Sequence, residues 1–267
     1  MSALASVALA AAPALAASPT DGGTTGSEGR TAKTILADHV EAIGGVKALK
    51  RPKSLRLVRK VTVKGMGIEG TEERFATSDN KFLSRTTIPG IGVVRTGSDG
   101  KVFWSEDPIN GLRVLSGLER EQARRDARWN AELHIDELYQ QVNVVPPPAN
   151  APTGGALECI ELASPKVPTI TICFDKSTHH RVFQTGRQAT PQGEIPFEAR
   201  FSAWKTYEGI TMPTVEETKA GPTAIVATLT EVKFGEKIDP TMFKLKAAKT
   251  SKAAPASPPQ PASPKAP

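Results

Sequence analysis

The chain has 267 residues, with 34 basic and 28 acidic side chains and two cysteines. Aromatic residues make up 5% of it and are not interleaved with the basic ones, so we expect no nucleic-acid partner. Neither a G-x-S-x-G nor an H-E-x-x-H motif is present, and the sequence predicts no catalytic residues, no metal site and no cofactor. These features favour a protein that holds a ligand or a partner over an enzyme.

Both ends of the chain differ in composition from the middle. Residues 1–17 are small and apolar and contain Ala14-Leu15-Ala16, which predicts a secretory signal peptide. The basic n-region of such peptides is missing, so a plain Ala-rich tail stays open as the alternative. Residues 18–30 predict a flexible linker, and the Lys-, Ala-, Pro- and Ser-rich residues 247–267 predict a disordered tail. We expect one folded domain over 31–246, exported to the periplasm as a soluble monomer.

The expected domain opens with a helix and continues as strands. Thr31 is a typical N-cap, and apolar residues recur at helical spacing up to Leu49, which predicts a helix over 31–49. Gly44-Gly45 should break or bend this helix. Period-two alternation of apolar and polar residues then predicts short strands. We expect them near 55–64, 68–77, 81–88, 91–97, 102–104, 157–163, 169–174, 180–187, 194–205, 209–218 and 223–234.

Residues 118–139 have a different texture from the strands around them. They are rich in Glu, Arg, Ala and Gln and contain neither Gly nor Pro, and Ala127, Ala131, Ile135 and Leu138 recur at helical spacing. A polar outer face and a modest apolar face are typical of a covering helix. We therefore expect one helix over 118–139 that acts as a lid on the sheet.

Many strands and few helices predict a mainly β (α+β) fold with a strongly curved antiparallel sheet. Such a sheet, of about ten strands, is not filled by two or three helices on its concave side. An unfilled apolar concavity binds a ligand or a partner. The candidate lining residues are Leu57, Val61, Trp129, Leu133, Phe197, Phe201 and Val226, although a plain core role is the alternative for each one.

Eight basic residues occur between 47 and 64 with no acidic residue among them. One interpretation is a patch that meets anionic headgroups, a membrane surface or an envelope protein, with Lys53, Arg56, Arg59 and Lys60 as candidates. The other is the solvated face of one strand, because several of these residues alternate with apolar ones. Both interpretations stay open at the level of sequence.

The two cysteines fall on two neighbouring predicted strands. Pairing Cys159 with Cys173 puts Ile160 opposite Ile172 and keeps the apolar residues on one face, so a cross-strand disulfide is geometrically natural. It is also expected in an exported chain. Two free thiols or a metal pair are the alternatives.

Several turn motifs, in this order along the chain, resemble those of LolA-like proteins, the outer-membrane lipoprotein-sorting superfamily. They are Glu41-Ala42-Ile43-Gly44-Gly45, Gly97-Ser98-Asp99-Gly100-Lys101-Val102-Phe103-Trp104, Phe174-Asp175-Lys176-Ser177-Thr178, Thr190-Pro191-Gln192-Gly193, Tyr207-Glu208-Gly209-Ile210-Thr211-Met212-Pro213 and Ile238-Asp239-Pro240-Thr241-Met242-Phe243.

The resemblance spans about 31–246 and implies an unclosed half-barrel with an N-terminal helix and a lid helix on its concave side. It also implies a non-enzymatic periplasmic carrier that binds acyl chains of a lipoprotein or lipid and uses no cofactor. The alternative is an envelope scaffold or interaction module whose concave face binds a protein partner.

Overall fold

The computed structural model describes residues 30–245 of the chain. The predicted signal peptide, the predicted tail and nearly all of the predicted linker lie outside these residues, so their assignments stay predictions. Every helix in the described part is too short or too polar to cross a lipid bilayer.

The described residues form a 13-stranded sheet. The strands are β1 (Ser54–Val63), β2 (Ile68–Thr77), β3 (Phe82–Ile88), β4 (Gly92–Ser98), β5 (Phe103–Asp107), β6 (Gly111–Val114), β7 (Gln141–Val145), β8 (Leu157–Ser164), β9 (Val167–Asp175), β10 (Arg181–Thr190), β11 (Gly193–Tyr207), β12 (Ile210–Ala220) and β13 (Thr223–Phe234).

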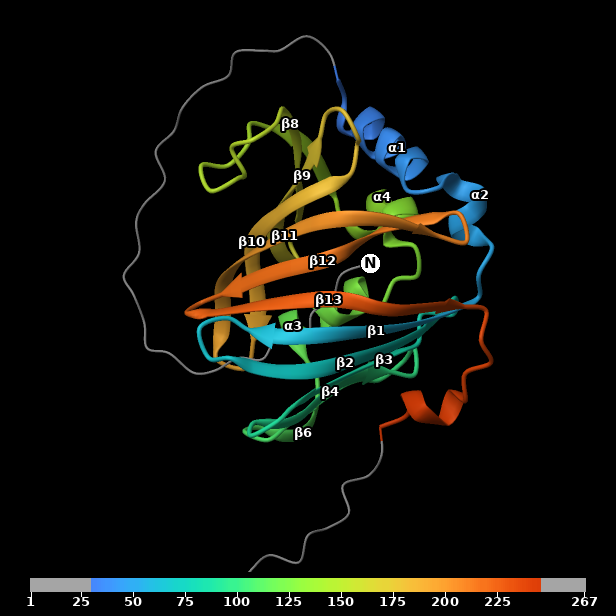
Figure 1. The fold of residues 1–267 in the computed structure, drawn as a ribbon, viewed down its shortest axis with the longest axis vertical. Helices are drawn as coiled ribbons and strands as arrows, with labels where there is room; N and C mark the ends of the chain where they lie inside the picture. Colours follow the sequence, from blue (N-terminus) through green and yellow to red (C-terminus); the bar gives the residue numbers. More distant parts are fainter. Residues whose placement is uncertain (1–29, 246–267) are drawn as a thin grey trace, which may run out of the picture.

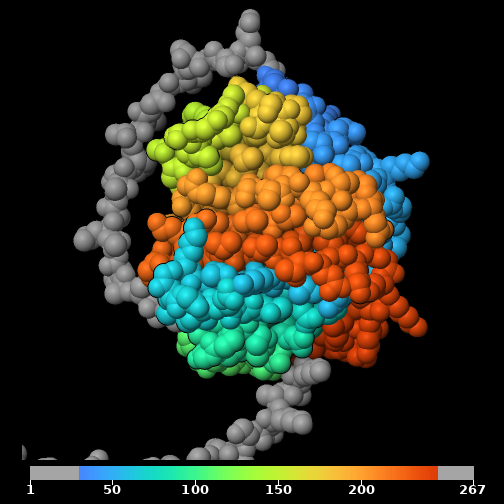
Figure 2. Space-filling view, in the orientation of Figure 1, coloured from blue at the N-terminus to red at the C-terminus, as the bar shows by residue number. Residues whose placement is uncertain are grey.

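The sheet is antiparallel and open. Its strand order is β6-β5-β4-β3-β2-β1-β13-β12-β11-β10-β9-β8-β7, so the chain ends its strands in the middle of the sheet, where β13 pairs with β1. The outer strands β6 and β7 do not pair with each other, which confirms the expected unclosed half-barrel. Figure 2 shows β9 to β13, β1 and β2 side by side as a continuous outer surface.

Short helices accompany the sheet at one end and on its inner side (Figure 1). They are α1 (Ala32–Ala42), α2 (Gly45–Lys50), α3 (Gly117–Asp126), α4 (Ile135–Leu138) and the 3-10 turns η1 (Ala131–Leu133) and η2 (Pro240–Phe243). Thr31 caps α1 as expected, because its hydroxyl accepts a hydrogen bond from the Thr34 amide at 3.2 Å. In Figure 1, α3 and α4 lie behind the sheet, whereas α1 and α2 lie along one end.

The break between α1 and α2 is required by close packing. Gly44 has φ +121°, and a Cβ atom there would lie 2.2 Å from the carbonyl oxygen of Gly209. The adjacent Ile43 carbonyl accepts a hydrogen bond from the Thr211 amide at 2.9 Å. Two motifs that are far apart in sequence therefore hold the helical end against the β11–β12 turn, and only glycine fits at Gly44.

The expected single helix over 118–139 is wrong. The chain forms α3, then turns, then η1 and α4, because Asn130 adopts a left-handed conformation with φ 51°. Two tertiary hydrogen bonds stabilise this break: Asn130 Nδ2 donates to the Leu49 carbonyl at 2.8 Å, and the Trp129 amide donates to Asn80 Oδ1 at 2.8 Å. Helical spacing in the sequence is thus overridden by bonds to distant segments.

The predicted disulfide and its register are confirmed. Cys159 is bonded to Cys173, and the same register places Ile160 opposite Ile172. Both cysteines are almost fully buried and pack with Phe183, which pairs with Cys173 on the next strand. Since neighbouring strand residues face opposite ways, Ile160 and Ile172 occupy the other face of the hairpin, in the core.

Candidate ligand cavity

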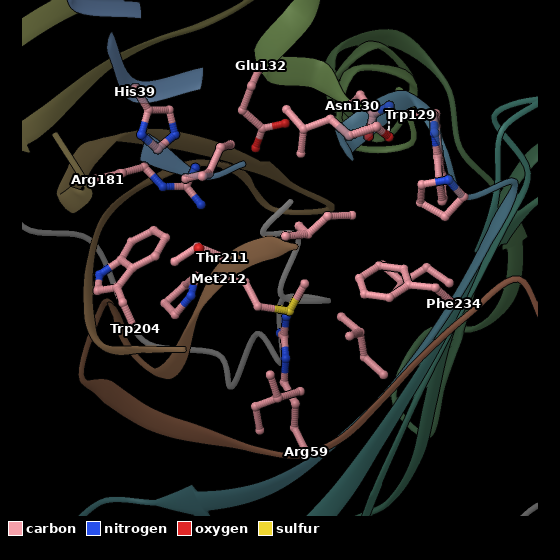
Figure 3. A pocket seen from close by; sticks show the side chains of 18 residues that line it. His39, Arg59, Trp129, Asn130, Glu132, Arg181, Trp204, Thr211, Met212 and Phe234 are labelled. Carbon is pink, nitrogen blue, oxygen red and sulfur yellow. Dashed lines mark hydrogen bonds between the residues drawn. The ribbon is translucent and has the colours of Figure 1, made fainter. Parts of the chain in front are cut away.

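The concave side of the sheet contains a cavity between β1, β12, β13 and the α1–α2 end, which we call the main cavity (Figure 3). It holds about 720 Å³ of space not filled by atoms, including the solvent at its mouth. Its apolar lining includes Leu49, Leu55, Leu57, Trp129, Met212, Leu229 and Phe234.

The apolar lining follows from the strand registers. On β1, Leu55 and Leu57 face inward, and they pair with Phe234 and Val232 of β13. Directly paired residues of antiparallel strands share a face, so the two strands present one continuous apolar surface. The main cavity is therefore lined by two strands, β1 and β13, that are neighbours in the sheet although they are the first and the last strand in the sequence.

Four ionisable side chains point into this apolar space: His39, Arg59, Glu132 and Arg181 (Figure 3). His39 Nδ1 donates to the His179 carbonyl at 2.8 Å, which fixes Nε2 as the acceptor of the neutral ring. Burial, offset in part by this bond, lowers the pKa of His39 to about 4. His39 is therefore neutral at pH 7 and adds polarity without charge.

Arg59 is held on the inner face by two carboxylates. Its Nη1 lies 3.3 Å from Glu72 Oε2 and 3.6 Å from Glu216 Oε2. Ser84 Oγ donates to the other oxygen of Glu72 at 2.9 Å. Arg59, Glu72 and Glu216 are all less than 9% exposed, so this is a buried charge network at the floor of the cavity.

A second cavity lies beside the main cavity, towards β8 and β9. Its apolar lining consists of Leu36, Ile135, Leu138, Tyr139, Leu162, Ile170, Ile172 and Phe174. It also shares His39, Glu132 and Arg181 with the main cavity. The concave side therefore offers two apolar cavities with a polar junction between them.

The helix α3 covers the concave side between the two ends of the open sheet. It contacts β5 near one edge and β9 and β10 near the other. Arg74 Nη2 donates to the Asp126 carbonyl at 3.1 Å, and Gln122 Oε1 accepts from the Ala189 amide at 2.9 Å. The covering role expected for the first part of 118–139 thus belongs to α3, which is tied to strands on both sides.

Most of the sequence-predicted lining residues occupy the inner face. Leu57 and Trp129 line the main cavity, and Val61 is buried two positions further along β1. Phe197 and Phe201 line a smaller, more polar hollow beside α3. Leu133 is not in the lining and packs against the core cluster at the α1–α2 end.

Val226 does not share the inner face. It pairs with Thr62, whereas its neighbour Ala227 pairs with the buried Val61. Because strand residues alternate between faces, Val226 lies on the outer face of β13. The sequence pattern identified the strand correctly, but the prediction that Val226 lies on its inner face is wrong.

The predicted basic patch is divided between the two faces of β1. Arg56 and Lys60 are on the outer face, where Arg56 contacts Glu73 and Glu231 and Lys60 contacts Glu69. Lys53 is exposed just before β1. Arg59 is buried inside, so it does not belong to an exposed patch. The alternation from Leu57 through Arg59 to Val61 was the sequence signal for this inward position.

The polar lining of the main cavity is tied to the backbone. Within the described residues, the ring of His39 is hydrogen-bonded to the His179 carbonyl. No group of three or more His, Cys, Asp or Glu side chains in the described part is placed to hold a metal ion.

No protein-family profile matches the sequence, and no curated protein matches it either. Solved structures do match the fold. A LolA superfamily protein from Nitrosomonas europaea has 13% identity and a TM-score of 0.54, over 81% of this chain and 99% of that one. A DUF1329 family protein from Desulfovibrio piger has 10% identity and a TM-score of 0.52, over 80% and 97%.

A domain from Vibrio parahaemolyticus, assigned as an outer membrane lipoprotein-sorting protein domain, has 11% identity and a TM-score of 0.52. The match covers 79% of this chain and 97% of that one. Each match covers nearly the whole of the other structure and about four fifths of this chain. The protein therefore has a LolA-like fold.

Proposed function

We propose that the protein is a non-enzymatic carrier of the cell envelope that binds acyl chains of a lipoprotein or lipid in the main cavity. The observation that carries this proposal is the largely apolar lining of the main cavity, which is open to solvent on the concave side of the sheet. A domain of the same fold is assigned to outer membrane lipoprotein sorting, which is consistent with it. The periplasm is the location that this role and the predicted signal peptide imply.

Acyl-chain binding makes a quantitative prediction. Burial of one methylene group contributes about 0.8 kcal/mol, or about a fourfold gain in affinity. A series of fatty acids from C8 to C14 should therefore bind with steadily rising affinity until the chain exceeds the cavity. Brominated chains should quench the fluorescence of Trp129 and Trp204, because both side chains line the cavity. Affinity that does not change with chain length would contradict the proposal.

A matched pair of variants on β13 tests the location. Leu229 lines the main cavity, whereas Thr228 is exposed on the outer face of the same strand. Leu229→Trp should fill the cavity and weaken binding, and Thr228→Trp should leave binding unchanged. If the two substitutions change affinity equally, the acyl chain does not bind in the main cavity.

The first measurement is native mass spectrometry of the protein exported to a bacterial periplasm and purified without detergent. Co-purified phospholipid or acylated peptide, released on denaturation, would support the carrier. A protein that stays free of lipid and takes up no added lipid would favour the interaction module, in which the concave face binds a protein segment.

A further inference from the structure

An arginine-rich groove lies outside both cavities, along α3. It is lined by Lys101, Arg120, Arg124, Arg128, Glu137 and Leu138, among others, and holds about 810 Å³ of space including open solvent. We call it the α3 groove. Its cations are separate from the basic residues 47–64 that the sequence singled out.

The three arginines come from α3 and the residues directly after it. Arg120 and Arg124 lie one turn apart on α3, so their side chains are neighbours on its surface, and Arg128 follows two residues after the end of the helix. All three line the α3 groove, and we call them the arginine row. Ala123 and Ala127 are buried, so small apolar residues anchor the segment that carries the row.

Two turns of the sheet form the facing wall. Gly100 and Lys101 belong to the β4–β5 turn, and Asn80 belongs to the β2–β3 turn. The Asn80 side chain accepts the amide of Trp129, directly after Arg128, at 2.8 Å. This bond fixes the position of the last arginine of the row relative to the turns, so the groove is preformed.

The charges of the groove do not cancel. Arg120 and Arg124 both contact Glu121, at 2.8 and 2.9 Å, and Arg128 contacts Glu137 at 2.6 Å. With Lys101 the groove has four cations against these two carboxylates, a surplus of two positive charges. The side chains of Arg120 and Arg124 are 47% and 48% exposed. A guanidinium has five N–H donors, so each keeps donors for a ligand.

Arg128 adds a buried donor. Its Nε is buried and has no hydrogen-bond partner among the described residues. Leaving such a donor unpaired costs about 1–3 kcal/mol, so a ligand acceptor at this position would be favourable. Guanidinium groups match phosphate oxygens in geometry and charge, and two or three of them together suit a phosphate group.

The groove adjoins the second cavity. Arg128 and Leu138 line both spaces, so the basic groove and the apolar second cavity are neighbours. We propose that the α3 groove binds the phosphate headgroup of a phospholipid whose acyl chains occupy the second cavity. This inference rests on the proposed function, extended from the main cavity to the second cavity, with which it shares His39, Glu132 and Arg181. It names the phosphate as the group that selects the ligand.

The test compares two ligands that differ only in the phosphate, dioctanoyl phosphatidic acid and dioctanoylglycerol, by isothermal titration calorimetry on the full chain. The wild-type protein should bind the phosphatidic acid at least about tenfold more tightly, as charge-assisted hydrogen bonds imply. Arg120→Gln together with Arg124→Gln should remove most of that preference and leave dioctanoylglycerol affinity unchanged. Thermal unfolding of this variant should stay close to the wild type, since both side chains are about half exposed.

The matched control is Arg85→Gln together with Arg187→Gln. These arginines are 48% and 56% exposed, contact Glu73 and Glu194, and lie outside the groove lining. This variant loses the same two charges, so it should keep the full preference. An equal loss in both double variants would show a general charge effect and overturn the inference.

Three further outcomes are decisive. Dioctanoylglycerol binding without any preference for the phosphate would overturn the inference and leave the proposed function standing. Failure to bind either lipid would instead remove the proposed function itself. Inorganic phosphate that binds the wild-type groove as tightly as the phosphatidic acid would identify free phosphate, not a lipid, as the ligand.

Discussion

Replacement of Arg59 by methionine tests whether the buried charge network under the main cavity holds the sheet together. The side chains of Arg59, Glu72 and Glu216 are 9%, 1% and 7% exposed. Arg59→Met keeps an unbranched chain of similar length but removes the one arginine whose ion pairs join Glu72 and Glu216, while the buried Arg74 and Arg181 stay nearby. The substitution therefore isolates the charge from most of the packing.

The expected loss is large because of this burial. Removal of one partner from a buried ion pair costs about 3–5 kcal/mol. For a domain of this size, 1 kcal/mol changes the melting temperature by about 2–4 °C, so Arg59→Met should lower Tm by about 6–20 °C. Arg59→Met with Glu72→Gln and Glu216→Gln should recover part of the loss, because the two side chains that paired with Arg59 are then neutral, although Arg74 and Arg181 beside them stay charged. Ser84 can still donate to the amide oxygen at position 72.

Arg56 provides the control on the same strand. It also contacts two carboxylates, Glu73 and Glu231, but its side chain is 22% exposed and theirs are 21% and 39% exposed. Exposed ion pairs contribute about 0–1 kcal/mol, so Arg56→Met should lower the free energy of unfolding by no more than about 1 kcal/mol for each of its two ion pairs. The assay is urea unfolding at pH 7, followed by circular dichroism. Equal losses for the two variants, or no recovery in the triple variant, would refute the reasoning.

The disulfide, one histidine and one glycine give further predictions. Cys159→Ser with Cys173→Ser opens a link between residues 14 apart and should cost about 2–4 kcal/mol in urea unfolding, matched by reduction of the wild type. Burial lowers the pKa of His39 from 6.5 to about 4, so the unfolded chain binds its proton first and stability falls as pH drops from 6.5 to 4. The free energy of unfolding should fall by about 3 kcal/mol over this range, and the His39→Asn variant should not show this fall. If the stability of the variant and of the wild type depends on pH in the same way, the prediction is wrong. A Cβ at position 97 would lie 2.6 Å from the Trp104 ring, so Gly97→Ala should cost about 1–3 kcal/mol in thermal unfolding.

Local patterns in the sequence predict the strands well. Each expected strand near β1 to β5 and β8 to β13 is present, with ends shifted by a few residues. The cysteine register is correct because alternation and pairing of apolar residues act between strands that are close in sequence. The short edge strands β6 and β7 carry too few alternating residues to be recognised and were missed.

Turn motifs predict contacts less directly, although their physical basis is visible in the fold. Gly97 and Trp104 are cross-strand partners, and the glycine leaves room for the indole ring. Gly44 allows the close approach of the β11–β12 turn. Each glycine reflects a contact with a distant segment, so the motif is local while its reason is tertiary.

The polar side chains inside the main cavity could not be predicted in the same way. Arg59 was assigned to an exposed patch because charge in a sequence suggests solvent. Its inward position depends on Glu72 and Glu216, which belong to strands on either side of β1 and β13. His39 and Glu132 gave no signal at all, since their positions depend on how α1 and η1 pack over the sheet.

The sequence by itself determined the mainly β class, the alternation of most strands, the disulfide and the helix cap, because these depend on interactions within or between neighbouring segments. Tertiary structure decided the break at Asn130, the face occupied by Arg59 and the existence of two cavities. A break in a helix and a buried charge are each stabilised by partners many residues away, and a cavity is the space that those partners leave unfilled. Such features depend on many long-range contacts acting together, and no single segment of the sequence encodes them.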